Sequence, residues 1–151
     1  MRETKSILIH GTCIAQDGAG ILIRGKSGAG KSDLALRMIN EGARLVADDQ
    51  VILIVRNFNL IGLPPVSLNG LLEIRGIGII NMPAQASAPI RLVVDLAEHK
   101  KIERFPVTKI AHLSGVNVPK VDLWAFEMSA VAKVKIALDV ALSRRSCKND
   151  C

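Results

Sequence analysis

The most informative stretch of the sequence is GILIRGKSGAGKSDLALRMINEG, residues 20–42. Its centre, GKSGAGKS (Gly25–Ser32), fits the phosphate-loop pattern G-x-x-x-x-G-K-S. The apolar, β-branched residues before it predict a strand over Gly20–Gly25. Ser32–Glu41 has the apolar spacing of a helix and Gly42 provides a stop signal, so we predict a helix of about three turns there. A strand, a glycine-rich loop and a helix in this order indicate an α/β fold built around a phosphate site.

The residue types of this loop suit the binding of a nucleotide or pyrophosphate. The backbone must wrap a phosphate with its N–H groups, and Gly28 and Gly30 permit the positive φ angles and close approach that this requires. The N-terminus of the helix adds its dipole. Lys31 can reach the β- and γ-phosphates, and the Ser32 hydroxyl is placed to bind Mg²⁺. We therefore expect cofactor contacts from the whole loop: Gly25, Lys26, Ser27, Gly28, Ala29, Gly30, Lys31 and Ser32.

Two adjacent carboxylates, Asp48 and Asp49, end the apolar segment RLVADD (Arg44–Asp49), which we predict to be a strand. In an α/β sheet, strand ends near the phosphate loop carry the chemistry. Beside a bound phosphate the two carboxylates repel each other unless Mg²⁺ or Lys31 neutralises one of them. The other can then accept a proton. The alternative interpretation is a solvated turn.

A second unusual stretch is LLEIRGIGIIN (Leu71–Asn81), where Glu73 and Arg75 interrupt a run of aliphatic residues and glycines. Two residues apart, they point to the same side of an extended chain, and burying them unpaired is costly. One interpretation is a metal-binding glutamate beside a phosphate-binding arginine, and the other is a structural ion pair at a sheet edge. His10 ends another apolar segment, but nothing local distinguishes a base or ligand from a structural histidine.

The remaining segments complete the pattern of a single compact domain over residues 1–146, with a flexible tail over 147–151. We predict three further buried strands, at Ser6–His10, Gln50–Val55 and Arg91–Leu96, and a helix near the end, at Ser129–Ser143. A turn at Asp17–Gly18 joins the first two predicted strands, and Asn57–Pro65 is predicted to be an irregular loop.

Composition excludes several classes of function. Three Phe, one Trp and no Tyr argue against a surface that stacks single-stranded bases, and the net charge of +6 suits anionic ligands without the basic stripe of a DNA-binding protein. No apolar run has the length of a membrane span or a signal peptide. The three cysteines lack metal-ligand spacing, as in proteins whose thiols stay reduced. We expect a cytoplasmic protein without nucleic-acid or membrane partners.

Taken together, H-G at His10, the phosphate loop, RLVADD and LEIRGIGIIN resemble the HPr kinase/phosphorylase family. The LEIRGIGIIN stretch discriminates best, because many families share phosphate loops, and the resemblance is strongest over residues 6–81. It implies a phosphate-loop core related to phosphoenolpyruvate carboxykinase, with a mixed sheet and flanking helices. It also implies ATP and Mg²⁺ as cofactors, HPr or an HPr-like phosphocarrier as partner, and a hexameric assembly.

The resemblance also implies roles for individual residues. Lys31 binds phosphate, Ser32 and Glu73 bind Mg²⁺ with support from Asp48, and Asp49 accepts the serine proton. His10 corresponds to the catalytic histidine of the family, and Arg104, in IERFP, to the arginine of a later loop. The catalytic set expected from the resemblance is His10, Lys31, Asp49 and Arg104.

Two departures from the family pattern shape the expected activity. The chain begins nine residues before His10, so we expect the short form without the N-terminal domain. VDLWAFEMSA stands where longer members have Pro-Gly-Arg-Asn, a motif linked to dephosphorylation. We therefore expect an ATP-dependent serine kinase for HPr of a bacterial phosphotransferase system, with phosphate-dependent dephosphorylation weaker than phosphorylation. The alternatives are a non-catalytic ATP-sensing module and a small-molecule kinase with a phosphate loop.

Overall fold

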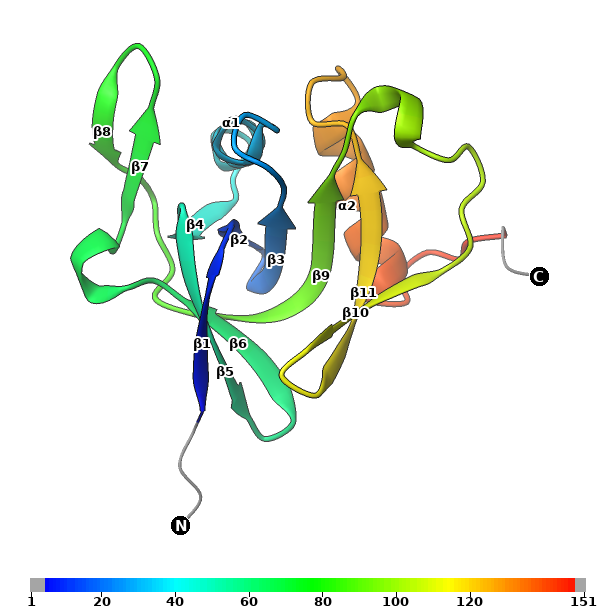
Figure 1. Cartoon of the computed structure of the whole chain (residues 1–151), viewed down its shortest axis with the longest axis horizontal. Coiled ribbons are helices and arrows are strands. Elements are labelled where there is room, and N and C mark those ends of the chain that lie inside the picture. Colours follow the sequence, from blue (N-terminus) through cyan, green and yellow to red (C-terminus); the bar gives the residue numbers. More distant parts are fainter. Residues whose placement is uncertain (1–4, 149–151) are drawn as a thin grey trace.

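The computed structural model describes residues 5–148 and contains eleven strands and two α-helices (Figure 1). The strands are β1 (Ser6–His10), β2 (Thr12–Gln16), β3 (Ala19–Arg24), β4 (Arg44–Ala47), β5 (Gln50–Arg56), β6 (Asn59–Leu63), β7 (Leu71–Ile74), β8 (Gly78–Asn81), β9 (Ala88–Leu96), β10 (Lys109–Leu113) and β11 (Val116–Leu123). The helices are α1 (Lys31–Asn40) and α2 (Ala130–Ala141), and the short 3₁₀ turns are η1 (Val66–Leu68) and η2 (His99–Lys101).

Nine of the strands form one curled, mixed sheet. Its path runs β1-β5-β6-β9-β3-β2-β4, with β11 also on β9 and β10 on β11. Strand β9 pairs in parallel with β3 and β11, whereas the other named strand pairs are antiparallel. The first two residues of β9 pair with β6, most of its remaining length pairs with β3, and its end also pairs with β11, so this one strand links the two parts of the sheet (Figure 1). Strands β7 and β8 form a separate hairpin.

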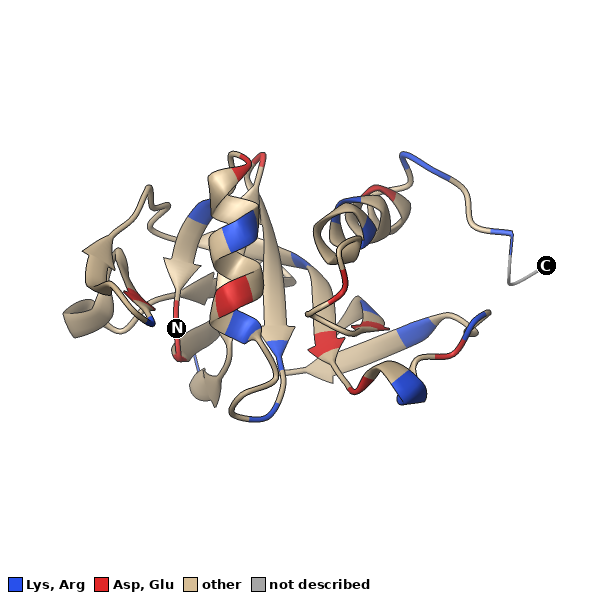
Figure 2. Cartoon of the chain, turned by 90° about the horizontal axis from the view of Figure 1, so that it is seen from above, with Lys and Arg blue, Asp and Glu red and all other residues tan. Residues whose placement is uncertain are grey.

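Both faces of the central strands are buried. On β3, Ile21 and Ile23 pack into the cluster that holds α1 and α2, while Leu22 packs into a second cluster with strands from the other part of the sheet. Successive side chains of a strand point to opposite faces, so a strand covered on both faces needs an unbroken apolar run. This explains why GILI is apolar at each position after its glycine. Both helices lie against the same face (Figure 2).

Both predicted helices and all five predicted strands are present, but one predicted connection is wrong and six strands were not predicted, namely β2, β6, β7, β8, β10 and β11. Strand β2 lies between the predicted strands, and the Asp17–Gly18 turn therefore joins β2 to β3 instead of the first predicted strand to β3. Strands β10 and β11 were not predicted. Their sequences mix charged and apolar residues because β11 is only partly covered.

Two further predictions were wrong about exposure and regularity. Strand β1 is mostly exposed, with Leu8 57% accessible, because it is an edge strand that pairs only with β5. The segment Asn57–Pro65 is largely strand β6, which forms a hairpin with β5. Asn57 and Phe58 both have positive φ angles at its turn, as two-residue hairpin turns require.

The described residues contain no helix long and apolar enough to cross a membrane. Of the predicted tail, residues 149–151 lie outside the described part of the chain.

Cys13 is fully buried and burial raises the pKa of its thiol to about 12, so this cysteine is protonated and unreactive at neutral pH. Cys147 is exposed.

A partly buried network of ion pairs holds the ends of β3, β9 and β11 together directly before the phosphate loop. Arg24 donates two hydrogen bonds to Asp95, at 2.7 and 2.9 Å, and Lys120 lies 3.0 Å from Asp95 and 2.9 Å from Asp122. Partial burial by itself would raise the pKa of Asp95, but the hydrogen bonds from Arg24 and Lys120 outweigh it and hold the pKa below its ordinary value of 3.8. The carboxylate of Asp95 therefore stabilises the folded state while it is ionised.

Replacing Asp95 with asparagine tests this network. Because the pKa is lowered on folding, the stabilisation is present above pH 3.8 and is lost as the pH falls through the folded value. We expect Asp95→Asn to reduce the free energy of unfolding by about 1 kcal/mol at pH 7, and by less near pH 3, in urea titrations at both pH values. Glu98→Gln, at the exposed ion pair with Lys100, is the control and should change little. An equal loss for Asp95→Asn at both pH values contradicts the electrostatic explanation.

Candidate functional site

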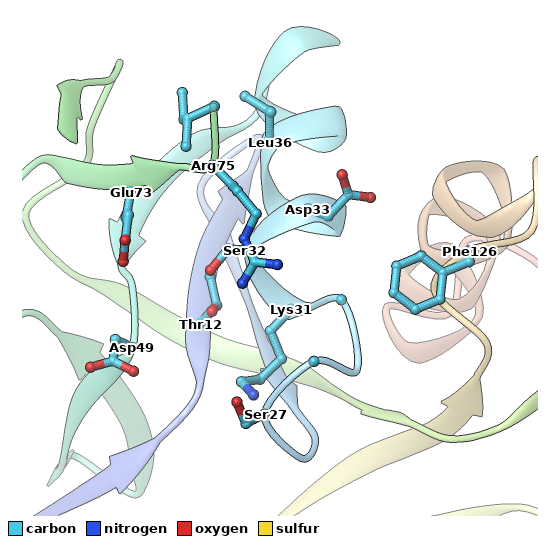
Figure 3. A pocket seen from close by; sticks show the side chains of 13 residues that line it. Thr12, Ser27, Lys31, Ser32, Asp33, Leu36, Asp49, Glu73, Arg75 and Phe126 are labelled. Atoms are coloured by element: carbon cyan, nitrogen blue, oxygen red, sulfur yellow. The ribbon is translucent and has the colours of Figure 1, made fainter. Parts of the chain in front are cut away.

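The loop between β3 and α1 has the backbone of a phosphate cradle. Gly28 and Gly30 have φ angles of 83° and 101°, and Gly30 is the N-cap residue of α1. The Lys31 ammonium donates to the backbone oxygens of Gly25, at 2.8 Å, and Lys26, at 3.0 Å. The lysine thus lies across its own loop, beside the backbone N–H groups that would face a bound phosphate (Figure 3).

Asp48 connects the start of α1 to the sheet. Its Oδ1 accepts hydrogen bonds from Ser32 Oγ, at 2.8 Å, and from Thr12 Oγ1, at 2.9 Å. Asp48 is only 8% exposed and Thr12 is fully buried. Thr12 is one of the site residues that sequence reasoning missed, together with Asp33, Leu36, Ile74 and Phe126. Its signal was a hydroxyl in an otherwise apolar strand, which is too common in β-sheets to indicate a site.

Asp49 turns away from Asp48 because of an unusual backbone conformation. Its φ angle is +68°, and its backbone oxygen accepts a hydrogen bond from Gly11 N–H at 3.1 Å. A second hydrogen bond, from Gln50 N–H to the Asp48 backbone oxygen at 2.8 Å, closes the tight connection. Positive φ is uncommon for residues other than glycine, although aspartate tolerates it better than most. The two carboxylates consequently have different surroundings. Asp48 accepts hydrogen bonds from the Ser32 and Thr12 hydroxyls, whereas Asp49 lines an open cavity.

A cavity of about 470 Å³ brings together many of the predicted residues, among them Lys31, Asp49 and Glu73, whereas Asp48 lies behind its lining (Figure 3). The phosphate loop and α1 form its floor, and the β7–β8 hairpin supplies Glu73 and Arg75 from above. Within residues 5–148, no ion pair joins Glu73 to Arg75, so the structural ion-pair interpretation finds no support. The lining residues are Thr12, Ser27, Gly28, Gly30, Lys31, Ser32, Asp33, Leu36, Asp49, Glu73, Ile74, Arg75 and Phe126.

Two predicted catalytic residues do not line this cavity. His10 is exposed at the end of β1, opposite Gln50 in the register, and precedes the glycine that binds the Asp49 backbone. His10 is therefore adjacent in the chain to a residue that hydrogen-bonds to Asp49, although His10 itself does not line the cavity. Arg104 belongs to the segment between η2 and β10, where its guanidinium lies 5.2 Å from the centre of the Phe105 ring. Gly25, Lys26 and Ala29 are not among the residues that line the cavity, although the first two supply backbone carbonyl oxygens to Lys31.

The oxygen donors at the phosphate loop are of the kind that binds magnesium together with substrate phosphates. Within the described residues, no group of three or more His, Cys, Asp or Glu side chains is arranged to hold a metal. Mg²⁺ is commonly held by one or two carboxylates, several waters and the phosphates of a substrate. The Ser32 hydroxyl and the Asp48 carboxylate, already side by side at the loop, are hard oxygen ligands of this kind.

Comparison with known proteins places this site in a family. The profile described as "HPr Serine kinase C-terminal domain" matches residues 2–149. The chain belongs to this family. The HPr kinase/phosphorylase of Clostridium acetobutylicum is 39% identical over 120 residues, which is 74% of this chain and 40% of that protein. The chain therefore spans about 40% of the length of this curated relative.

A solved structure supports the same assignment. The HPr(Ser) kinase/phosphatase from Coxiella burnetii aligns with a TM-score of 0.81 and 28% sequence identity, over 91% of this chain and 97% of that chain. This agreement confirms the fold that the resemblance implied. It extends beyond the residues that carried the resemblance, into the second half of the chain.

The two loop glycines allow a matched test of packing at the site. A Cβ atom at Gly30 would lie 2.8 Å from Ala125 Cβ and 2.9 Å from Phe126 Cζ, whereas a Cβ at Gly28 meets nothing within 4 Å. Both positions have positive φ, so alanine is strained at each by about 1 kcal/mol. We expect Gly30→Ala to cost roughly 1–3 kcal/mol more than Gly28→Ala in the free energy of unfolding without nucleotide. Equal losses contradict the close packing of the 125–126 segment on the loop.

Proposed function

We propose that this chain is the catalytic part of an ATP-dependent, Mg²⁺-requiring protein kinase that phosphorylates a serine of HPr or an HPr-like phosphocarrier of a bacterial phosphotransferase system. The observation that carries the proposal is one cavity that holds a phosphate loop, with Lys31 and Ser32, and a separately oriented carboxylate, Asp49. Membership of the HPr kinase family supplies the class of acceptor. We further propose a cytoplasmic homo-oligomer, a hexamer by family resemblance.

The loop side of the cavity binds and orients the nucleotide phosphates. Lys31 exchanges its hydrogen bonds to the loop carbonyls for the β- and γ-phosphate oxygens. Ser32 and Asp48, with Glu73 from the hairpin, are the residues that would hold Mg²⁺. When bound, the ion neutralises charge that develops on the phosphate oxygens. Arg75 adds a positive charge at the cavity.

The opposite side of the cavity supplies the general base that accepts the serine proton. The serine Oγ attacks the γ-phosphorus, its O–H proton passes to Asp49, and ADP departs with the electrons of the broken P–O bond. Asp49 is available for this because Asp48, not Asp49, accepts the two hydroxyl hydrogen bonds. His10 and Arg104 remain proposed catalytic residues that would act from outside the cavity, His10 beside the Asp49 backbone.

Two other functions fit fewer of the residues. A non-catalytic ATP-sensing module has no need for both Asp49 and Glu73 at the phosphate site, and a small-molecule kinase gives no reason for the hairpin of residues 71–81.

We also propose that phosphorylation exceeds phosphate-dependent dephosphorylation. The reverse reaction brings two anions together, and the segment around Trp124 to Glu127 adds no cation there.

Transfer of label from [γ-³²P]ATP to purified HPr tests the proposed activity. We expect Mg²⁺-dependent, serine-linked label, and no label with Lys31→Ala, whose side chain serves the phosphate and not the core. HPr with its acceptor serine changed to alanine is the substrate control. Incubating the labelled HPr with millimolar phosphate then compares the two directions. Absence of label across metal and ATP concentrations rejects the kinase, and reverse transfer as fast as forward transfer rejects the proposed direction.

Asp49→Asn separates proton transfer from nucleotide binding. The amide keeps the size of the side chain but cannot act as the base, so we expect kcat to fall by roughly 10²- to 10⁴-fold while ATP affinity is retained. Steady-state kinetics and calorimetric binding measure the two effects. Asp33→Asn, at a carboxylate that lines the same cavity but pairs with Arg37, is the matched control. Lost ATP binding in Asp49→Asn would instead assign Asp49 to holding the metal.

A further inference from the structure

Phe126 is an aromatic side chain at the phosphate cavity to which the proposed chemistry gives no role. It lines the same cavity as Lys31 and Asp49, and 54% of its surface is exposed. Figure 3 shows Phe126 on one side of the phosphate loop and Asp49 with Glu73 on the other. It is the one aromatic residue among the described residues that line the cavity. An aromatic ring half open to a polar cavity has a face available for a ligand.

The backbone around Phe126 is held from several directions. The backbone oxygen of Ala125 accepts a hydrogen bond from the Arg37 guanidinium, and Ala125 itself is fully buried. On the other side, Glu127 forms an ion pair with Lys133 at 2.6 Å. The ring is also close to the loop, because a Cβ atom added to Gly30 would lie 2.9 Å from Phe126 Cζ. The position of the ring relative to the phosphate loop is therefore set by the folded chain before any ligand binds.

The two sides of the cavity differ in chemistry, as do the phosphate end and the base end of a nucleotide. Lys31 and the loop N–H groups suit phosphates, and Asp49 and Glu73 mark the side where the γ-phosphate meets the acceptor. The opposite end of the nucleotide then extends toward Phe126. A base presents a flat π face, and stacking on an aromatic ring needs no particular hydrogen-bond pattern.

We propose that Phe126 is the base-stacking platform of this site and that its ligand is a purine nucleoside triphosphate. This inference rests on the proposed function, because it requires the phosphate loop to bind a nucleotide. Stacking needs no particular hydrogen-bond pattern, so it contributes to the affinity for ATP and GTP alike, and discrimination between the two purines by the Phe126 ring is weak.

Calorimetric binding of ATP, GTP and inorganic tripolyphosphate, all with Mg²⁺, tests the platform. We expect Phe126→Ala to raise the Kd of both nucleotides by roughly tenfold and to leave the Kd of tripolyphosphate unchanged. Phe126→Trp should retain nucleotide affinity. Phe58→Ala, at an exposed phenylalanine on the distant β5–β6 turn, is the matched control and should alter none of the three. In NMR spectra, the adenine ring protons should shift upfield on binding to the wild type and not to Phe126→Ala.

The outcomes separate this inference from the function on which it rests. An unchanged nucleotide Kd in Phe126→Ala overturns the platform, as does an equal loss for nucleotides and tripolyphosphate, which would show that the ring only supports the loop. If the wild-type chain binds tripolyphosphate as tightly as ATP, the platform is wrong while the phosphate site stands. If it binds neither, the phosphate site and the proposed kinase activity fail together.

Discussion

The site depends on one buried carboxylate oxygen, Asp48 Oδ1, which accepts hydrogen bonds from Ser32 and Thr12. These two bonds join the first turn of α1, the start of β2 and the end of β4, three segments that the chain supplies separately. A buried carboxylate with too few donors is costly, so the sheet and the helix must keep both hydroxyls in place. The phosphate loop is consequently anchored at the helix end by this contact and at the strand end by the pair of Arg24 with Asp95.

The second constraint is the backbone turn that separates Asp49 from Asp48. Two ionised carboxylates that face the same ligand repel each other. Here Asp48 is enclosed, whereas Asp49 faces the cavity. The positive φ of Asp49 and the hydrogen bond from Gly11 to its backbone produce this division. The unusual backbone conformation thus lies at the residue that we propose as the general base.

Much of the fold could be read from the chain because its signals are local. The phosphate loop combines glycines, a lysine and a serine at set spacing, and α1 follows with apolar residues at helical intervals. Strand β1 was predicted as buried because its sequence is as apolar as that of β3, and only its place at the sheet edge decides that it is exposed. Strand β6 was not predicted because the segment around it, residues 57–65, contains two asparagines, a glycine and two prolines, a composition typical of loops, and only the pairing with β5 shows it to be a strand.

Residue types a few positions apart are enough to identify the phosphate loop, the paired aspartates and the Glu73–Arg75 segment. Which side chains share a cavity depends instead on the packing of the whole chain. It brought Thr12 onto Asp48 across 36 positions and set Phe126 beside Gly30, and it left Arg104 outside. The physical reason is that such contacts depend on how the curled sheet and its helices pack, which no short window of residues encodes.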